Sequence, residues 1–254
     1  MPSVATNDFT SKVPGVTLGF WVIKILATTL GETGGDTLSM TFNLGYLVSS
    51  LIFLAVLALF LFLQISARRF RPFLYWATII ASTTAGTTMA DFATRSLGIG
   101  YTGGSAILLA LVIASLLAWK FTIGRIDADD IHDRRTELFY WLTITFSQTL
   151  GTALGDWVAD TNDLGYVKAG LIFAALLALV AALYFFTRLN RVILFWCAFV
   201  LTRPLGAAVG DFLDKPRDHG GLAFSRPLAS AALAAAIVLL LVLIPQRPGR
   251  HDAH

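Results

Sequence analysis

Four copies of one segment occur in this sequence, and this internal repeat constrains the fold more than any other feature. In each copy a tryptophan stands ten residues before a glycine and fifteen before an aspartate, and the copies align without a gap. The copies are FWVIKILATTLGETGGD from Phe20, YWATIIASTTAGTTMAD from Tyr75, YWLTITFSQTLGTALGD from Tyr140 and FWCAFVLTRPLGAAVGD from Phe195. Self-similarity of this kind is typical of chains that use one structural unit several times. We therefore expect four equivalent units.

A long apolar run follows each copy. The runs are Tyr46–Ser66, Ser105–Phe121, Ala169–Thr187 and Pro227–Pro245. Each is close to the roughly 20 residues that a helix needs to cross the hydrocarbon core of a bilayer. The chain is 56% hydrophobic and only 14% charged, whereas average soluble proteins are about 25% charged. Each run is therefore predicted to be a transmembrane helix.

The repeated segments themselves are less apolar, and each contains at least one acidic residue. They lie near residues 16–36, 73–92, 138–157 and 193–212. Taken alone, such segments are compatible with re-entrant or buried core helices, but their equivalence favours four further spans. The predicted fold is an all-α membrane protein of eight transmembrane helices, arranged as four parallel two-helix repeats around a pseudo-symmetry axis normal to the membrane.

One membrane domain, residues 1–254, is expected. Its repeats cover about residues 12–66, 72–122, 137–188 and 192–245, with a charged connector at 123–136 and a tail at 246–254. Twelve of the 19 Lys and Arg lie on the side where the first helix of each repeat begins. Cytoplasmic loops carry an excess of these residues, so both termini are predicted to be cytoplasmic. No secretory signal is expected, because the first 15 residues contain no apolar segment.

This arrangement resembles a family of bacterial membrane proteins that consist of four tandem repeats of unknown function, each with two transmembrane regions and a characteristic tryptophan. The resemblance covers about residues 12–245. It depends on the four tryptophans and their Gly and Asp companions: Trp21, Trp76, Trp141 and Trp196. It implies the architecture and a bacterial cytoplasmic (inner) membrane location, but no activity, so function has to be argued from the residues.

One face of each repeated helix is polar. At about 100° per residue, the aspartate shares a face with the residues four, seven and eight positions before it. The polar residues on this face, besides the aspartates, are Thr28, Thr29, Glu32, Thr83, Thr84, Thr87, Gln148, Thr149, Thr152 and Arg203. Lipid penalises such groups, so this face is predicted to line the protein interior. Pairs of small residues beside it, Gly31 and Gly35 in the first copy, favour close packing of these four helices at the centre.

The acidic residues are the candidate functional groups. They are the four repeated aspartates and one glutamate: Asp36, Asp91, Asp156, Asp211 and Glu32. A charge at the centre of a membrane helix costs roughly 2.5–3.5 kcal/mol on insertion scales, so a cation, a proton, a basic partner or backbone donors must compensate. Two interpretations stay open. The acids bind a cation together with threonine and carbonyl oxygens, or they cap loops and hold the repeats together.

Four polar residues occur in one copy only: Lys24, Glu32, Gln148 and Arg203. The fold does not need them, which favours a functional role. If the repeats close into a ring, the first and fourth copies are neighbours, and Glu32 and Arg203 are expected to form a buried ion pair. This pair either fixes the helix packing or provides a counter-charge that cation entry displaces.

The four tryptophans allow two interpretations. They form an aromatic plug below an outward-facing polar vestibule, or an interfacial aromatic belt.

The class of metal ion that could bind follows from the ligand atoms that the chain offers. The four histidines lie in loops or the tail and Cys197 is the only thiol. Oxygen ligands then suit Mg, Ca or Mn better than zinc or copper.

We therefore expect a secondary transporter or exporter of a small cation, of the hard divalent type (Mn, Mg or Ca), with proton coupling through the carboxylates. The alternatives are a non-transporting membrane scaffold or sensor, and a transporter of a small organic solute recognised by threonines, Gln148 and Arg203. The sequence contains no Gly-rich phosphate loop, no G-x-S-x-G and no H-E-x-x-H motif, so neither an enzyme nor a nucleic-acid partner is expected. No cofactor is predicted beyond a bound divalent cation. The oligomeric state is left open.

Overall fold

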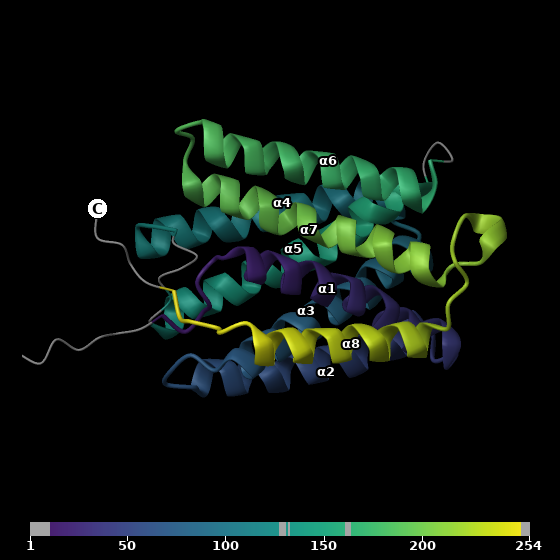
Figure 1. Cartoon of the computed structure of the whole chain (residues 1–254), viewed down its shortest axis with the longest axis horizontal. Coiled ribbons are helices and arrows are strands. Elements are labelled where there is room, and N and C mark those ends of the chain that lie inside the picture. Colours follow the sequence, from purple (N-terminus) through teal and green to yellow (C-terminus); the bar gives the residue numbers. More distant parts are fainter. Residues whose placement is uncertain (1–10, 127–130, 132, 161–163, 250–254) are drawn as a thin grey trace, which may run out of the picture.

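The computed structural model describes residues 11–126, 131, 133–160 and 164–249, and in this part of the chain eight α-helices form the fold (Figure 1). The helices are α1 (Leu18–Asp36), α2 (Gly45–Ser66), α3 (Pro72–Asp91), α4 (Gly100–Ile123), α5 (Arg134–Asp160), α6 (Gly165–Phe186), α7 (Arg191–Asp214) and α8 (Arg226–Leu243). The all-α class is thus confirmed. Parts of the predicted connector, residues 127–130 and 132, and of the predicted tail, residues 250–254, lie outside the described residues.

Local sequence explains where several helices begin. Thr17 caps α1 by accepting a hydrogen bond from the backbone N–H of Phe20, and Asn190 caps α7 in the same way. Such caps satisfy backbone donors that have no partner within the helix. The second helices of the first three repeats begin with a glycine in the left-handed conformation, and φ is 72° at Gly45, 73° at Gly100 and 71° at Gly165. Side chains disfavour this conformation, which explains why a glycine recurs there.

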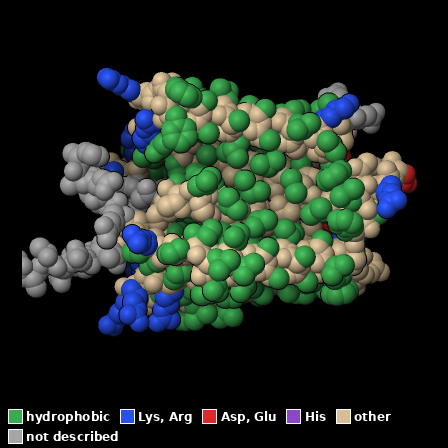
Figure 2. Space-filling model, viewed as in Figure 1, with side chains coloured by type: hydrophobic (Ala, Val, Ile, Leu, Met, Phe, Trp, Pro, Cys, Tyr) green, Lys and Arg blue, Asp and Glu red, His purple; other side chains and the backbone are tan. Residues whose placement is uncertain are grey.

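Five of the described helices, α2, α4, α6, α7 and α8, are long and apolar enough to cross a membrane. Their mean hydropathies range from 1.9 for α7 to 2.7 for α2. Hydrophobic side chains cover the flank of the bundle, and Lys and Arg gather at its ends (Figure 2). The protein is therefore a membrane protein. Helices α1, α3 and α5 are not among these five, and their polar faces lower their mean hydropathy.

The first helices of the repeats form a closed central ring. Helix α1 packs against α3 and α7, and α5 also packs against α3 and α7. The outer helices do not pack mainly on the inner helix of their own repeat: α2 lies on α3, α4 on α5, α6 on α7, and α8 on α1. Each repeat therefore covers the next one, and α8 of the fourth repeat covers α1 of the first (Figure 1).

Repeated glycines set the spacing of the ring. A Cβ added at Gly31 would lie 2.4 Å from Thr83 Cγ2, and one at Gly151 would lie 2.3 Å from Arg203 Cγ. The same relationship closes the ring, because a Cβ at Gly206 would lie 2.2 Å from Thr28 Oγ1. Small residues let helix backbones approach closely. This contact explains why the first glycine of each small-residue pair is present in all four copies.

An aromatic cluster fills one end of the ring. Trp76, Trp141 and Trp196 are buried in it, whereas Trp21 is half-buried. The hydroxyl groups of Tyr75 and Tyr140 lie 2.6 Å apart within the same cluster. An interfacial aromatic belt therefore does not describe the three buried tryptophans, because their position on the inward face of the central helices directs them into the core.

Candidate polar site in the central ring

Four buried layers of equivalent residues follow one another along the ring, because every fourth residue of each central helix faces the centre. Starting at the aspartates, the first layer contains Asp36, Asp91, Asp156 and Asp211. The second contains Glu32, Thr87, Thr152 and Ala207, and the third Thr28, Thr83, Gln148 and Arg203. The fourth contains Lys24, Ile79, Ile144 and Phe199 and adjoins the aromatic cluster. The polarity of the ring thus falls from the aspartates towards the aromatic end.

Arg203 connects all four central helices. From α7, its Nη2 donates to Glu32 Oε2 of α1 at 2.9 Å. The same nitrogen donates at 2.5 Å to the hydroxyl oxygens of Thr87 in α3 and Thr152 in α5. The guanidinium is fully buried. The predicted Glu32–Arg203 ion pair is confirmed, since ring closure makes the first and fourth repeats neighbours.

The aspartate layer is divided into two bridged pairs. Lys215 Nζ lies 2.8 Å from Asp36 Oδ2 and 3.0 Å from Asp211 Oδ1. Arg95 makes the corresponding bridge, with Nε 3.2 Å from Asp91 Oδ1 and Nη2 3.0 Å from Asp156 Oδ2. Each basic residue therefore joins the aspartate of its own repeat to that of the next repeat.

Sequence reasoning did not identify Arg95 and Lys215 as site residues. The sequence feature that could have identified them is their position four residues after the aspartate in copies two and four. This spacing places the acid and the base on one helix face. The equivalent residues in copies one and three are Met40 and Asp160. The bridging pattern thus repeats every second unit, not every unit.

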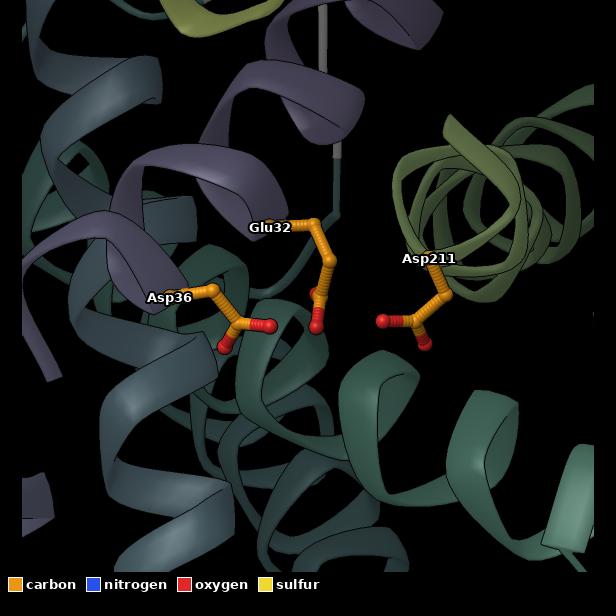
Figure 3. Close-up of side chains that lie close together, drawn as sticks. All are labelled: Glu32, Asp36 and Asp211. Carbon is orange, nitrogen blue, oxygen red and sulfur yellow. The ribbon is translucent and has the colours of Figure 1, made fainter. Parts of the chain in front are cut away.

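Three carboxylates come close together. Glu32, Asp36 and Asp211 each offer an oxygen atom within 4.8 Å of the others, and all three are buried. Their carboxylates point towards one another from α1 and α7 (Figure 3). Asp91 and Asp156 do not belong to this group among the described residues. The structure therefore brings together three of the five acids that the sequence suggested as one ligand set.

Lys215 follows α7 directly and contacts two members of this group, Asp36 and Asp211. Burial alone would lower the pKa of its ammonium group. Asp211, Asp36 and Asp214 outweigh burial and raise that pKa well above its ordinary value. The ammonium group is therefore held in its charged form. Arg226 adds a second cation near Asp36, with Nε 3.9 Å from Oδ2.

Three of the predicted lining threonines are satisfied by their own helices. The hydroxyl of Thr29 donates to the carbonyl of Ile25 at 3.0 Å, and Thr84 and Thr149 make the same bond to the residue four positions earlier. Thr28 donates within α1 and also to the carbonyl of Thr202 in α7 at 3.1 Å. These hydroxyl donors serve helix geometry and packing. Among the predicted hydroxyls, Thr87 and Thr152 are the ones that contact a charged group.

Lys24 is a further buried basic residue, in the fourth layer. Its Nζ lies 3.4 Å from Gln148 Oε1 and 4.0 Å from the centre of the Phe199 ring. Its equivalents in the other copies are apolar. The occurrence of a lysine in one copy only is the signal that sets this position apart.

A closed ring of four two-helix repeats, with charges buried at its centre and an apolar flank, defines the chain as a membrane protein built by internal repetition. The chain belongs to the family described as Repeat of Unknown Function (DUF347), whose repeat matches residues 19–70, 74–124, 139–190 and 194–245. This confirms the resemblance to a four-repeat family of unknown function. No match to the chain was found among the curated proteins or among the solved structures.

Proposed function

We propose that the protein is a secondary transporter of a small cation, of the hard divalent type and coupled to protons. In this proposal all eight helices span a bacterial cytoplasmic membrane, and both termini lie in the cytoplasm. The polar helices α1, α3 and α5 are compatible with this topology because the ring shields their polar faces from lipid. The excess of Lys and Arg at the end of the bundle that contains the termini supports the sidedness.

The observation that carries the proposal is the carboxylate group of Glu32, Asp36 and Asp211, which lies within 4.8 Å and is buried. Carboxylate oxygens are the ligands that Mg, Ca and Mn prefer. A group of buried carboxylates also requires a compensating positive charge. Lys215 supplies one such charge from the edge of the ring, on a flexible side chain.

The proposed mechanism is an exchange of cations. An incoming metal ion replaces the Lys215 ammonium group between Asp36 and Asp211, while Arg203 stays bound to Glu32. Protons replace the metal ion when it leaves, and their later release lets Lys215 return between the two aspartates, which couples the two fluxes. The aromatic cluster around Trp76 and Trp141 closes the opposite end of the ring, so passage requires a conformational change that opens it.

Flux measurements in proteoliposomes test this proposal. Purified protein is reconstituted with a metal-sensitive dye inside, and Mn, Mg and Ca are added with and without a pH gradient. We expect one of these ions to enter in a pH-dependent manner, and Asp36→Asn to abolish the flux. Asp218→Asn, at an exposed residue of the short 3-10 helix Arg217–His219, is the matched control and should keep the flux. Absence of flux for all three ions at every pH would contradict the proposal.

A non-transporting scaffold or sensor is the second candidate. The observation in its favour is that Lys215 and Arg95 each connect aspartates of different repeats. In a scaffold the aspartates exist for stability, so Asp36→Asn should lower the melting temperature strongly. In a transporter the same variant should lose flux while its melting temperature falls only moderately, because Lys215 keeps its contact with Asp211.

A further inference from the structure

We propose that Lys24, Gln148 and Arg203 form a buried binding site for a small monovalent anion, separate from the carboxylate group. The three side chains come from α1, α5 and α7 and are completely buried. Gln148 and Arg203 occupy the same layer of the ring, and Lys24 lies one helical turn further towards the aromatic cluster. The site does not depend on the proposed transport of cations.

The first argument is that several buried hydrogen-bond donors have no acceptor among the described residues. Of the nitrogens of the Arg203 guanidinium, only Nη2 has hydrogen-bond partners in the described part of the chain, and Nε and Nη1 have none. The Gln148 Nε2 amide also has none among these residues, although its Oε1 accepts from Lys24. Buried donors without a partner cost about 1–3 kcal/mol each, and more when they are charged. Three such donors, on two side chains of one layer of the ring, point to a ligand that accepts hydrogen bonds.

The second argument is the charge of this part of the ring. Lys24 and Arg203 are basic residues that lie close enough to interact electrostatically. The carboxylate of Glu32 compensates the charge of Arg203, with Oε2 2.9 Å from Nη2. Within the described residues no carboxylate forms an ion pair with Lys24, whose contacts are the Gln148 amide oxygen and the Phe199 ring. A protonated Lys24 therefore has no counter-charge in this buried position, and a bound monovalent anion would supply it.

The third argument comes from the repeat. Positions equivalent to Lys24 hold Ile79, Ile144 and Phe199, and the fold tolerates these apolar residues. Three copies therefore form the ring without a charge at this level. Lys24 and Arg203 come near each other only because α1 and α7 meet where the ring closes. The pair of cations is thus an addition to the scaffold and not part of it.

The ligand class follows from the donors. A guanidinium edge, an amide N–H and an ammonium group suit a halide or a small carboxylate. A metal cation is disfavoured by the two adjacent positive charges. The test therefore compares chloride, formate and acetate with a bulky sulfonate, all as sodium salts at one ionic strength.

The experiment measures the thermal unfolding of the purified full-length protein in detergent. For the wild type we expect at least one small anion to raise the melting temperature by about 3–5 °C for each tenfold increase in its concentration above the dissociation constant. The anion that acts distinguishes a halide site from a carboxylate site. An unchanged melting temperature with all three anions means that the donors are satisfied by water or that Lys24 is neutral, and overturns the proposal.

Two variants make the test specific. Gln148→Glu places a carboxylate beside Lys24 and Arg203, so it should raise the melting temperature without added anion and abolish the anion response. Lys168→Met, at an exposed lysine of α6, is the control and should respond like the wild type. A Gln148→Glu protein that still responds fully to the anion would show that the anion binds elsewhere and would overturn the proposal.

Discussion

Lys215 Nζ lies 2.8 Å from Asp36 Oδ2, and this contact joins the end of the fourth repeat to the first. Arg95 makes the equivalent contact with Asp156 at 3.0 Å, across the junction of the second and third repeats. The glycine contacts relate all four repeats alike, whereas these ion pairs relate the two halves of the chain. The ring therefore has fourfold pseudo-symmetry in its backbone packing and twofold pseudo-symmetry in its charges.

Removing the Lys215 charge should destabilise the protein. Lys215→Met leaves two buried aspartates short of a counter-charge, and breaking a buried ion pair costs about 3–5 kcal/mol. Chemical unfolding in detergent measures the loss. If the carboxylate group binds a divalent cation, millimolar Mn should restore part of the stability. The control Lys168→Met should leave stability unchanged, and an equally stable Lys215→Met protein would refute the role of this ion pair.

The contributions of Arg203 and Glu32 to the free energy of unfolding should depend strongly on each other. Arg203→Met leaves Glu32 buried without its charge partner, and we expect a loss of about 3–5 kcal/mol. Changing both residues, Arg203→Met with Glu32→Gln, removes both charges and should be more stable than Arg203→Met alone. A double-mutant cycle on unfolding free energies measures this coupling. Additive effects of the two substitutions would contradict the ion pair.

The glycine contacts predict which small residues tolerate a methyl group. Gly151→Ala should destabilise by about 1–3 kcal/mol, because the added Cβ would lie 2.3 Å from Arg203 Cγ and force the helices apart. Gly34→Ala is the matched control, since the nearest atom there is Thr84 Cγ2 at 3.9 Å. In a helix interior that control should be neutral or slightly stabilising. Equal effects at the two positions would argue against close packing at the ring.

Asp133 gives a pH-dependent prediction outside the membrane helices. It accepts hydrogen bonds from the backbone N–H groups of Arg135, at 2.8 Å, and Thr136, at 3.0 Å, and thereby caps α5. Partial burial raises the pKa of Asp133, but the hydrogen bonds from Thr136 and Arg135 outweigh it and hold the pKa below its ordinary value. The stabilisation is therefore complete above the unfolded-state pKa of about 3.9 and is lost as the pH falls through the folded-state pKa.

Asp133→Ala should accordingly cost about 1 kcal/mol at neutral pH. The difference from the wild type should shrink as the pH falls below about 4. Asp133→Asn retains a capping oxygen and should lose little at any pH. Melting temperatures across a pH series measure both variants, and a pH-independent difference for Asp133→Ala would show that the charge is not involved.

The aromatic cluster should act as a barrier if the ring axis is a pathway. Trp76 is completely buried there, so Trp76→Ala removes a large part of the packing and should increase passive ion leak through proteoliposomes. Phe121→Ala removes an aromatic ring that is 82% exposed and should not change the leak. Unchanged permeability in both variants would show that Trp76 does not close a pathway.

Several features of the architecture follow from the pattern of residues alone. The anchors from Trp21 to Asp36 repeat four times, and an apolar run follows each copy, so the number of helices was predictable. The polar face of each repeated helix predicted which helices lie inside, because lipid excludes such groups. The Glu32–Arg203 pair also followed, given a closed ring of equivalent repeats.

Other features depend on three-dimensional packing. Sequence order suggests that α2 lies beside α1, yet α2 packs mainly on α3, because shape and the position of small residues decide which helix faces meet. The division of the four aspartates into two bridged pairs could not be predicted from the sequence either. Long flexible side chains such as Arg95 and Lys215 can reach several partners, and their choice depends on the distances between repeats. Periodicity along one helix determines which way a residue faces, whereas the partner across the interface is determined by how the helices are placed.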